Sequence, residues 1–333
     1  MSLDPKIRAC LTLPAICAPM YRITNPALVR EACKGGLVGG LPRQNARDLE
    51  TFEAWLAEIR TALDAHAAAT AGARIGPVAV NLSRLPDDEL KAHLAICRRY
   101  GVEIIISAMG DPTELIQRVH EWGGKVFHDA TTLRFAEKAI AAGADGLTCI
   151  GSGGGGHSGL ISHLALIPKV RQMFDGTIVL AGAVSTGAAI RAAEILGADL
   201  AYLGTRFIAT EEANADPEYK QMLVTETATD VIFTPRVAGG AANWLKASLR
   251  RVGLDPDNLP KPGPKGGHSH LPEGLRPWFN IWSAGQGIEL ISDIPSVADL
   301  ILRLRREYVA ACETPDMADV ARLVDRAQAK QPA

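Results

Sequence analysis

A strand-then-helix alternation repeats eight times along this 333-residue chain. Continuous apolar strands that are each followed by a helix indicate a parallel sheet covered on its outer face. Eight such units are expected to close a (β/α)8 TIM barrel of the α/β class. The eight apolar or β-branched runs are Ala15–Ala18, Leu37–Gly40, Val78–Asn81, Ile104–Ser107, Val126–His128, Gly146–Ile150, Ile178–Ala181 and Ala201–Leu203.

The segments between these runs have apolar residues at helical spacing. Gly101, Gly143 and Gly197 each stand between such a segment and the next strand, where a glycine readily takes the left-handed conformation that ends a helix. We therefore predict a helix end at each of them. The clearest helical segments are Leu49–Ala68, Asp87–Tyr100, Pro112–Trp122, Leu133–Ala142 and Ala188–Leu196.

The alternation stops after Thr210. Residues 211–283 are expected to form a helical insertion after strand 8 that covers the C-terminal mouth of the barrel as a substrate lid. Residues 1–210 and 284–333 would then form the barrel with its C-terminal helices. The insertion has helical patterns near Pro217–Ala228 and Asn243–Val252 and a Pro/Gly-rich loop at Leu259–Pro277, and the C-terminal helices are expected at Ile294–Ala311 and Met317–Ala329.

The charge balance restricts the class of partner. Thirty-five Lys and Arg against 37 Asp and Glu give a net charge of −2, so we expect neither nucleic acid nor a membrane surface as a partner. Pro14 and Pro19 interrupt the apolar stretch Leu11–Met20, so we expect it to be neither a signal peptide nor a membrane-spanning segment. The sequence is therefore interpreted as that of a cytoplasmic protein. The six cysteines include no CxxC pair, so no metal site is expected. Small molecules are the expected partners.

A glycine-rich segment, Gly151–Gly159, follows the sixth predicted strand. Without Cβ atoms its backbone can lie against a flat or anionic ligand and direct amides at it. Of its side chains, only His157 has an acid–base range near neutral pH. No Gly-Lys-Ser/Thr follows, which argues against a nucleotide P-loop, and a flexible linker is the competing interpretation.

Glycines also follow strands seven and eight. In TIM barrels the loops after these two strands commonly bind phosphate through backbone amides. Gly182–Ala183 and Gly204–Thr205 occupy these positions, although ordinary tight turns would also use glycine here.

Taken together, these segments resemble the nitronate monooxygenase family, formerly called 2-nitropropane dioxygenases. The likeness extends over nearly the whole chain. It is carried by Gly156–Gly159, Leu180–Gly187, Gly197–Thr210, Ala18–Met20, Asn81 and Trp282–Gly287.

The resemblance implies an FMN-dependent oxidoreductase, a flavoprotein in which His157 is the catalytic residue. FMN-binding residues would be Ala18, Pro19, Met20, Asn81, His128, Gly155, Gly156, Gly182, Ala183, Gly204 and Thr205. The chain departs from the usual family pattern at two places. Many members have Glu-Ala-Gly-Gly-His where this chain has Gly153–His157, so the glutamate is absent. At the phosphate site, Ala183 stands where the family pattern has a second glycine.

For several other candidate site residues, both a functional and a structural interpretation are open. Asn243, Ser283 and Gln286 would close the pocket on the substrate side or serve the structure alone. His128 would contact the flavin or hold a barrel loop by hydrogen bonding. His268 and His270 lack a visible third metal ligand, and Trp244, Trp278 and Trp282 are interpreted as lid packing.

The expected reaction is the FMN-dependent oxidation of alkyl nitronates, and of nitroalkanes if they are accepted, with O2 to carbonyl compounds and nitrite. The alternative is an NAD(P)H-dependent flavin reductase of quinones or enoyl thioesters, because the same fold and motifs also resemble those enzymes. A non-catalytic flavin barrel is a third class. The residues leave open whether NAD(P)H is a reductant, whether the chain forms a homodimer, and whether His157 acts as a base or stabilises a bound anion.

Overall fold

Eight parallel strands form a closed barrel in the computed structural model, which describes residues 2–82, 85–262 and 267–313. The last barrel strand pairs with the first through Ala15 and Ala201, which closes the sheet. The (β/α)8 prediction is therefore confirmed. In barrel order the strands are β1 (Ala15–Cys17), β2 (Val38–Pro42), β3 (Val78–Leu82), β4 (Ile104–Ser107), β5 (Lys125–Ala130), β6 (Gly146–Ile150), β8 (Thr177–Ala181) and β9 (Leu200–Leu203).

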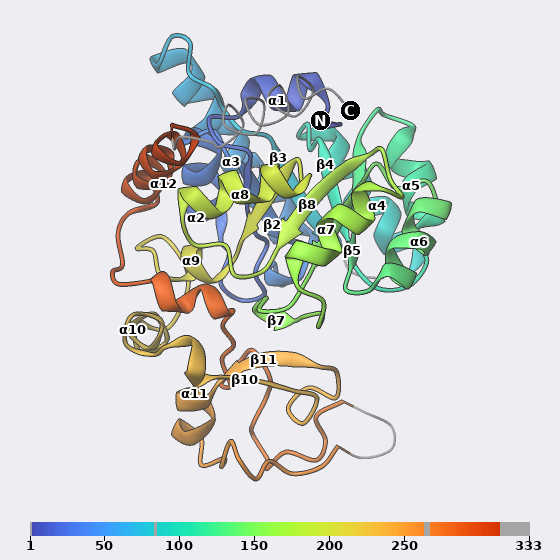
Figure 1. Ribbon diagram of the computed structural model, residues 1–333. Coiled ribbons are helices and arrows are strands. Elements are labelled where there is room, and N and C mark those ends of the chain that lie inside the picture. The colour runs from blue at the N-terminus through green and yellow to red at the C-terminus, as the bar shows by residue number, and fades with distance from the viewer. Residues whose placement is uncertain (1, 83–84, 263–266, 314–333) are drawn as a thin grey trace, which may run out of the picture.

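Helices surround the barrel (Figure 1). Side chains of Asn25, Asp48, Thr132, Thr186 and Ser296 cap helix N-termini by accepting a backbone N–H, and the three glycines predicted to end helices all have positive φ. The helices are α2 (Pro26–Lys34), α3 (Leu49–Ala69), α4 (Asp87–Arg99), α5 (Thr113–His120), α6 (Leu133–Ala141), α7 (His163–Arg171), α8 (Gly187–Leu196), α9 (Thr205–Ile208) and α12 (Val297–Cys312), with the short turn η1 (Arg43–Asn45) after β2.

The barrel interior is apolar at its N-terminal end. Ile16, Val38, Ile104 and Phe127 pack there with residues of the N-terminal segment, including Ile7 of α1 (Pro5–Cys10). The sequence analysis did not anticipate this helix. It closes the end of the barrel where the strands begin.

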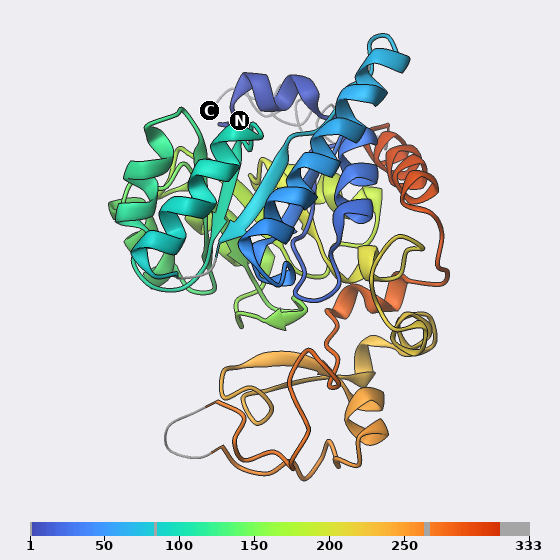
Figure 2. The ribbon, with the colours of Figure 1, turned by 180° about the vertical axis from the view of Figure 1, so that it is seen from behind.

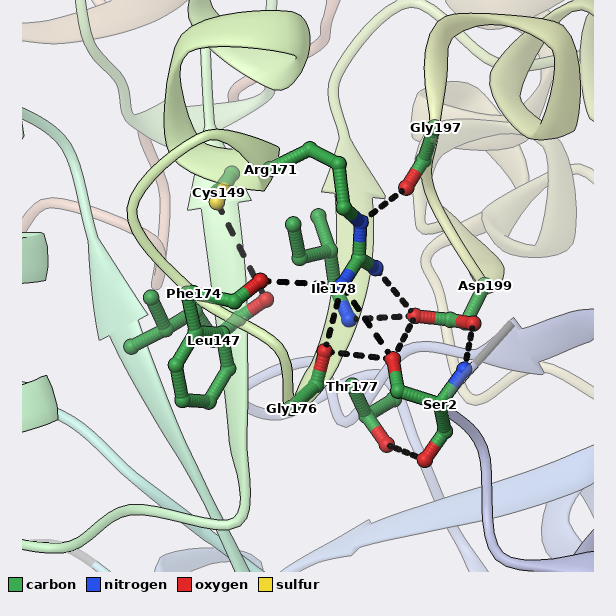
Figure 3. Close-up of polar contacts among 10 residues, drawn as sticks. All are labelled: Ser2, Leu147, Cys149, Arg171, Phe174, Gly176, Thr177, Ile178, Gly197 and Asp199. Carbon is green, nitrogen blue, oxygen red and sulfur yellow. Dashed lines mark hydrogen bonds and ion pairs between the residues drawn. The ribbon is translucent and has the colours of Figure 1, made fainter.

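A polar cluster fixes the N-terminus at this closed end (Figure 3). The Asp199 carboxylate accepts hydrogen bonds from the Ser2 N–H at 2.8 Å and the Ile178 N–H at 2.9 Å, and it pairs with Arg171 at 2.6 Å. Burial alone would raise the pKa of Asp199, but these donors and the Arg171 charge lower it. The cluster therefore depends on an ionised aspartate.

The insertion lies at the opposite end of the barrel, beside β7 (Gly156–His157), in both views (Figures 1 and 2). It is only partly helical. Its strands join β7 in an antiparallel sheet in the order β10–β11–β7, and Trp244, Leu249 and Ile281 belong to its own apolar cluster. Its elements are α10 (Pro217–Thr225), η2 (Ala228–Asp230), β10 (Val231–Thr234), β11 (Ala242–Leu245) and α11 (Lys246–Arg251), and η3 (Gln286–Leu290) leads back to the barrel.

Two predicted helix boundaries are corrected. The helix expected from Asn243 begins at Lys246, because Ala242–Leu245 pairs with the β-branched and aromatic run of β10. The helix expected from Ile294 begins at Val297, where the Ser296 side chain caps it. The predicted helix Met317–Ala329 lies outside the described residues. Within the described ranges, no helix has the length and apolar character needed to cross a bilayer.

Candidate active site

A cavity of about 510 Å³ lies at the C-terminal ends of the barrel strands. Its walls come from the turns after β1, β6, β8 and β9 and from the insertion and its return segment. This is the end at which TIM barrels place their active sites. The lining includes Ala18, Pro19, Met20, Tyr21, Gln44, Gly155, Gly156, His157, Gly182, Ala183, Tyr202, Gly204, Thr205, Tyr219, Trp278, Trp282 and Ser283.

Four backbone N–H groups on this lining are unused. Those of Gly182, Ala183, Gly204 and Thr205 donate to no protein acceptor within the described ranges. Both Gly182 and Ala183 have positive φ, +125° and +57°. Ala183 thus holds a left-handed conformation that ordinarily favours glycine, and its amide remains available despite the extra methyl group.

No described cation stands beside these four residues of the cavity lining. Arg206 follows Thr205 directly, yet its side chain is 2% exposed and donates to the Ala209 and Asp293 carbonyls. Among the described residues, none that lines the cavity is Lys, Arg, Asp or Glu. An anionic group bound here would be held by backbone dipoles.

Three backbone segments meet at one edge of the cavity. The Gly285 N–H donates to Thr205 Oγ1 at 2.9 Å, and the Gln286 N–H donates to the Gly153 carbonyl at 2.8 Å. A Cβ on Gly285 would lie 2.6 Å from the Gly153 oxygen, and one on Gly155 would lie 3.0 Å from the Gly285 nitrogen. Glycine is required here because the chains approach too closely for side chains.

His157 stands at the insertion side of the cavity on β7, opposite Ala242 of β11. Its ring contacts the Trp278 indole, with centroids 5.1 Å apart and planes tilted by 43°. Burial lowers the pKa of His157, and no charged neighbour contributes to the shift. His157 is nonetheless exposed at the cavity, and the lowered pKa favours a neutral imidazole that can accept a proton.

Most of the predicted site residues are brought together. Four of them do not line the cavity: Asn81, His128, Asn243 and Gln286. Asn81 donates to the Ile106 carbonyl, and the buried His128 ring contacts Ser107 Oγ at 2.8 Å, which favours the loop-holding interpretation of His128. The Gln286 side chain is exposed.

Asn243 acts on the site indirectly. Its side chain is buried, and Nδ2 donates to the Gly154 carbonyl at 2.6 Å. Ser283 does line the cavity, and its carbonyl oxygen accepts a hydrogen bond from the Tyr219 hydroxyl. The insertion thus contacts the glycine-rich segment and also supplies part of the cavity wall.

The aromatic lining was largely missed from sequence. Tyr219 stacks on Trp282 with centroids 4.9 Å apart and an interplanar angle of 9°, and the Arg251 guanidinium lies 3.8 Å from the Trp282 ring centroid. Trp278 and Trp282 were expected only to pack within the lid, yet both line the cavity. The available signal was that Trp282 begins the segment Trp282–Gly287 and that Trp278 lies four residues before it.

Comparisons with known proteins agree with this architecture. A family model described as nitronate monooxygenase matches residues 50–307. A nitronate monooxygenase of Paraburkholderia phytofirmans is 26% identical over 350 aligned residues, covering 90% of this chain and 93% of that protein. A nitronate monooxygenase of Neurospora crassa is 30% identical over 245 residues, covering 64% of each.

Solved structures show the same fold. A nitroalkane oxidase from Streptomyces ansochromogenes aligns with a TM-score of 0.74 at 23% identity, covering 92% of this chain and 99% of that one. FabK from Thermotoga maritima aligns with a TM-score of 0.72 at 22% identity, covering 94% and 98%. At this level of identity the likeness extends to the fold alone.

Proposed function

The chain belongs to the nitronate monooxygenase family, and from this premise we propose that it uses FMN to oxidise alkyl nitronates with O2 to carbonyl compounds and nitrite. Members of the family are flavin-dependent oxidoreductases, and this chain is one. The choice of FMN, the substrate and the residue roles are the parts proposed here. The observation that carries them is a cavity that combines four free backbone donors with one neutral histidine.

The backbone donors fit the phosphate of FMN. The N–H groups of Gly182, Ala183, Gly204 and Thr205 would hold it, as loops after strands seven and eight do in other TIM barrels. The flat ring system would lie among Ala18, Pro19, Met20 and the glycine-rich segment, where few side chains intervene. When bound, the flavin supplies the redox chemistry.

His157 would be the catalytic residue, acting as a general base. A neutral nitroalkane must lose a proton from carbon before it can react as a nitronate, and the neutral imidazole would accept that proton and become imidazolium. Because burial lowers the pKa of His157, a mostly neutral imidazole would offer little positive charge to stabilise a bound anion. This favours the base over the anion-stabilising role.

The insertion, residues 211–283, would act as the substrate lid. It supplies Tyr219, Trp278, Trp282 and Ser283 to the cavity lining. Aromatic walls without charged side chains favour a small substrate with an apolar body.

The same lining gives less support to the reductase alternative. A nicotinamide dinucleotide or a carrier-protein thioester brings additional phosphates, which basic side chains commonly bind. The described cavity offers no Lys or Arg for them.

One experiment separates the two functions. The purified, FMN-loaded protein is mixed anaerobically with a 2-nitropropane nitronate or with NADH while the flavin absorbance is followed. We expect the nitronate to change the flavin spectrum quickly, and aerobic turnover to yield nitrite and acetone. Rapid flavin reduction by NADH without nitrite formation from nitronate would instead support the reductase.

A further inference from the structure

Among the described residues, none forms a hydrogen bond that would orient the His157 ring. No bond to either ring nitrogen occurs within the ranges that the structure describes, and no carboxylate influences its pKa. A catalytic histidine is commonly oriented by a carboxylate or carbonyl on its second nitrogen. Something else must fix the direction of this ring.

Two groups confine the imidazole. The Trp278 indole contacts the ring, with centroids 5.1 Å apart. The backbone of Gly240 lies beside another edge, since a Cβ on Gly240 would be 3.0 Å from His157 Nε2 and 3.2 Å from Cδ2. The described residues next to His157 are Trp278, Gly240 and its cross-strand partner Ala242, and none of these is charged.

Trp278 is itself held firmly. Its φ of +60° is in the left-handed region, which a bulky side chain rarely adopts. The Trp278 N–H donates to the Ile281 carbonyl at 2.8 Å, and the buried Trp244 ring packs against the indole with centroids 4.9 Å apart. Strained backbone of this kind persists where the surroundings enforce it, and it is concentrated at functional sites.

We propose that Trp278 is the positioning residue of His157, and that its indole fixes the imidazole by aromatic contact in place of a hydrogen-bonding partner. Such a contact restricts the ring without bringing a charge beside it, and it excludes water from one side. The imidazole therefore stays neutral and aimed into the cavity. The kinetic part of this proposal rests on the proposed function, whereas the structural part does not.

The test compares Trp278→Phe, Trp278→Ala and Gly240→Ala in FMN-loaded protein. Trp122→Phe, a change at a tryptophan that packs against the outer core after α5, is the matched control. Gly240 has no positive φ, so Gly240→Ala does not strain the backbone. The added methyl group should press on the imidazole edge at Nε2 and displace the ring.

The first readout is the pH titration of the His157 ring by NMR, assigned with His157→Asn. Trp278→Ala admits water to the imidazole, so the His157 pKa should rise, while Trp278→Phe and Trp122→Phe should stay near the wild-type value. This readout needs no substrate. It decides the structural part even if the protein does not oxidise nitroalkanes.

The second readout is kcat/KM for neutral 2-nitropropane relative to its preformed nitronate. Misplacing a reacting group can cost about 10²-fold, so Trp278→Ala and Gly240→Ala should lose about 10- to 100-fold on the neutral substrate and much less on the nitronate. Trp278→Phe should recover most of the loss. The proposal is overturned if flavin-replete Trp278→Ala keeps both the wild-type His157 titration and the wild-type substrate ratio.

Discussion

The Nδ2 atom of Asn243 donates to the carbonyl oxygen of Gly154 at 2.6 Å, which joins the insertion to the glycine-rich segment. The bond is buried, and β11 also pairs with β7 at Gly156 and His157. The insertion therefore contacts the glycine-rich segment directly at Gly154, Gly156 and His157.

Asn243→Ala should loosen this connection. The Gly154 carbonyl would lose its partner inside the protein, which costs about 1–3 kcal/mol of unfolding free energy. We also expect weaker flavin retention, measured by the absorbance that remains after gel filtration. Asn214→Ala, which removes an exposed bond to the Arg22 carbonyl, is the control. Equal flavin retention in the two variants would show that Asn243 does not shape the flavin site.

Gly204 offers a charge-specific test of the phosphate site. A Cβ on Gly204 would lie 3.7 Å from Met20 Sδ and 3.8 Å from Ala18 Cβ, so a small side chain fits. Gly204→Asp should release FMN because its carboxylate would repel the phosphate, and the nearly isosteric Gly204→Asn should retain far more. The FMN content per chain and the thermal midpoint check this. If both variants lose FMN equally, charge at this position is not the cause.

The strand and helix pattern could be predicted from sequence because it is local. The apolar runs that became β3, β4 and β8 bury both faces of a parallel sheet, so almost every residue in them is apolar. Gly101, Gly143 and Gly197 were identified for a similar reason, since a left-handed helix end favours glycine.

The parts that were missed depend on contacts between distant residues. Strand β7 is two residues within a glycine run, and only its pairing with Ala242 and Asn243 makes it a strand. The aromatic contact between Trp278 and His157 arises in the same way. The contact of the His128 ring nitrogen with Ser107 could likewise not be read from its place at a strand end.

Asp129 should make stability depend on pH. Residues two apart on a strand share a face, so Asp129 follows Phe127 into the barrel interior, where Oδ1 has no partner among the described residues. Burial raises its pKa from 3.8 to about 7. The folded state then binds a proton that the unfolded state has lost, so stability should fall as pH rises from about 4 to about 7 and then level off.

Asp129→Asn removes this titration. Its thermal midpoint should exceed that of the wild type by a margin that grows over the same pH interval, with the exposed Asp255→Asn as the control. A margin independent of pH would show that Asp129 titrates normally.

Asp199 should act in the opposite sense. Its pKa is lowered in the folded protein, so its contribution to stability is complete above the unfolded pKa and is lost as pH falls through the folded pKa. Asp199→Asn should cost about 1–3 kcal/mol at neutral pH, and less in acid. Chemical denaturation at several pH values measures this. A cost that does not shrink in acid would contradict the ionised-carboxylate account.

The most direct test of the central claim compares wild type with His157→Asn, both FMN-replete, in steady-state oxygen uptake and nitrite release across pH. We predict that the wild type oxidises preformed nitronate, and that its rate on neutral nitroalkane rises with pH through the lowered His157 pKa and then stays high. His157→Asn should lose about 10²- to 10⁴-fold on neutral nitroalkane and retain much of the nitronate rate. Full activity of His157→Asn on both substrates, or no nitrite from wild type with nitronate, would contradict the account.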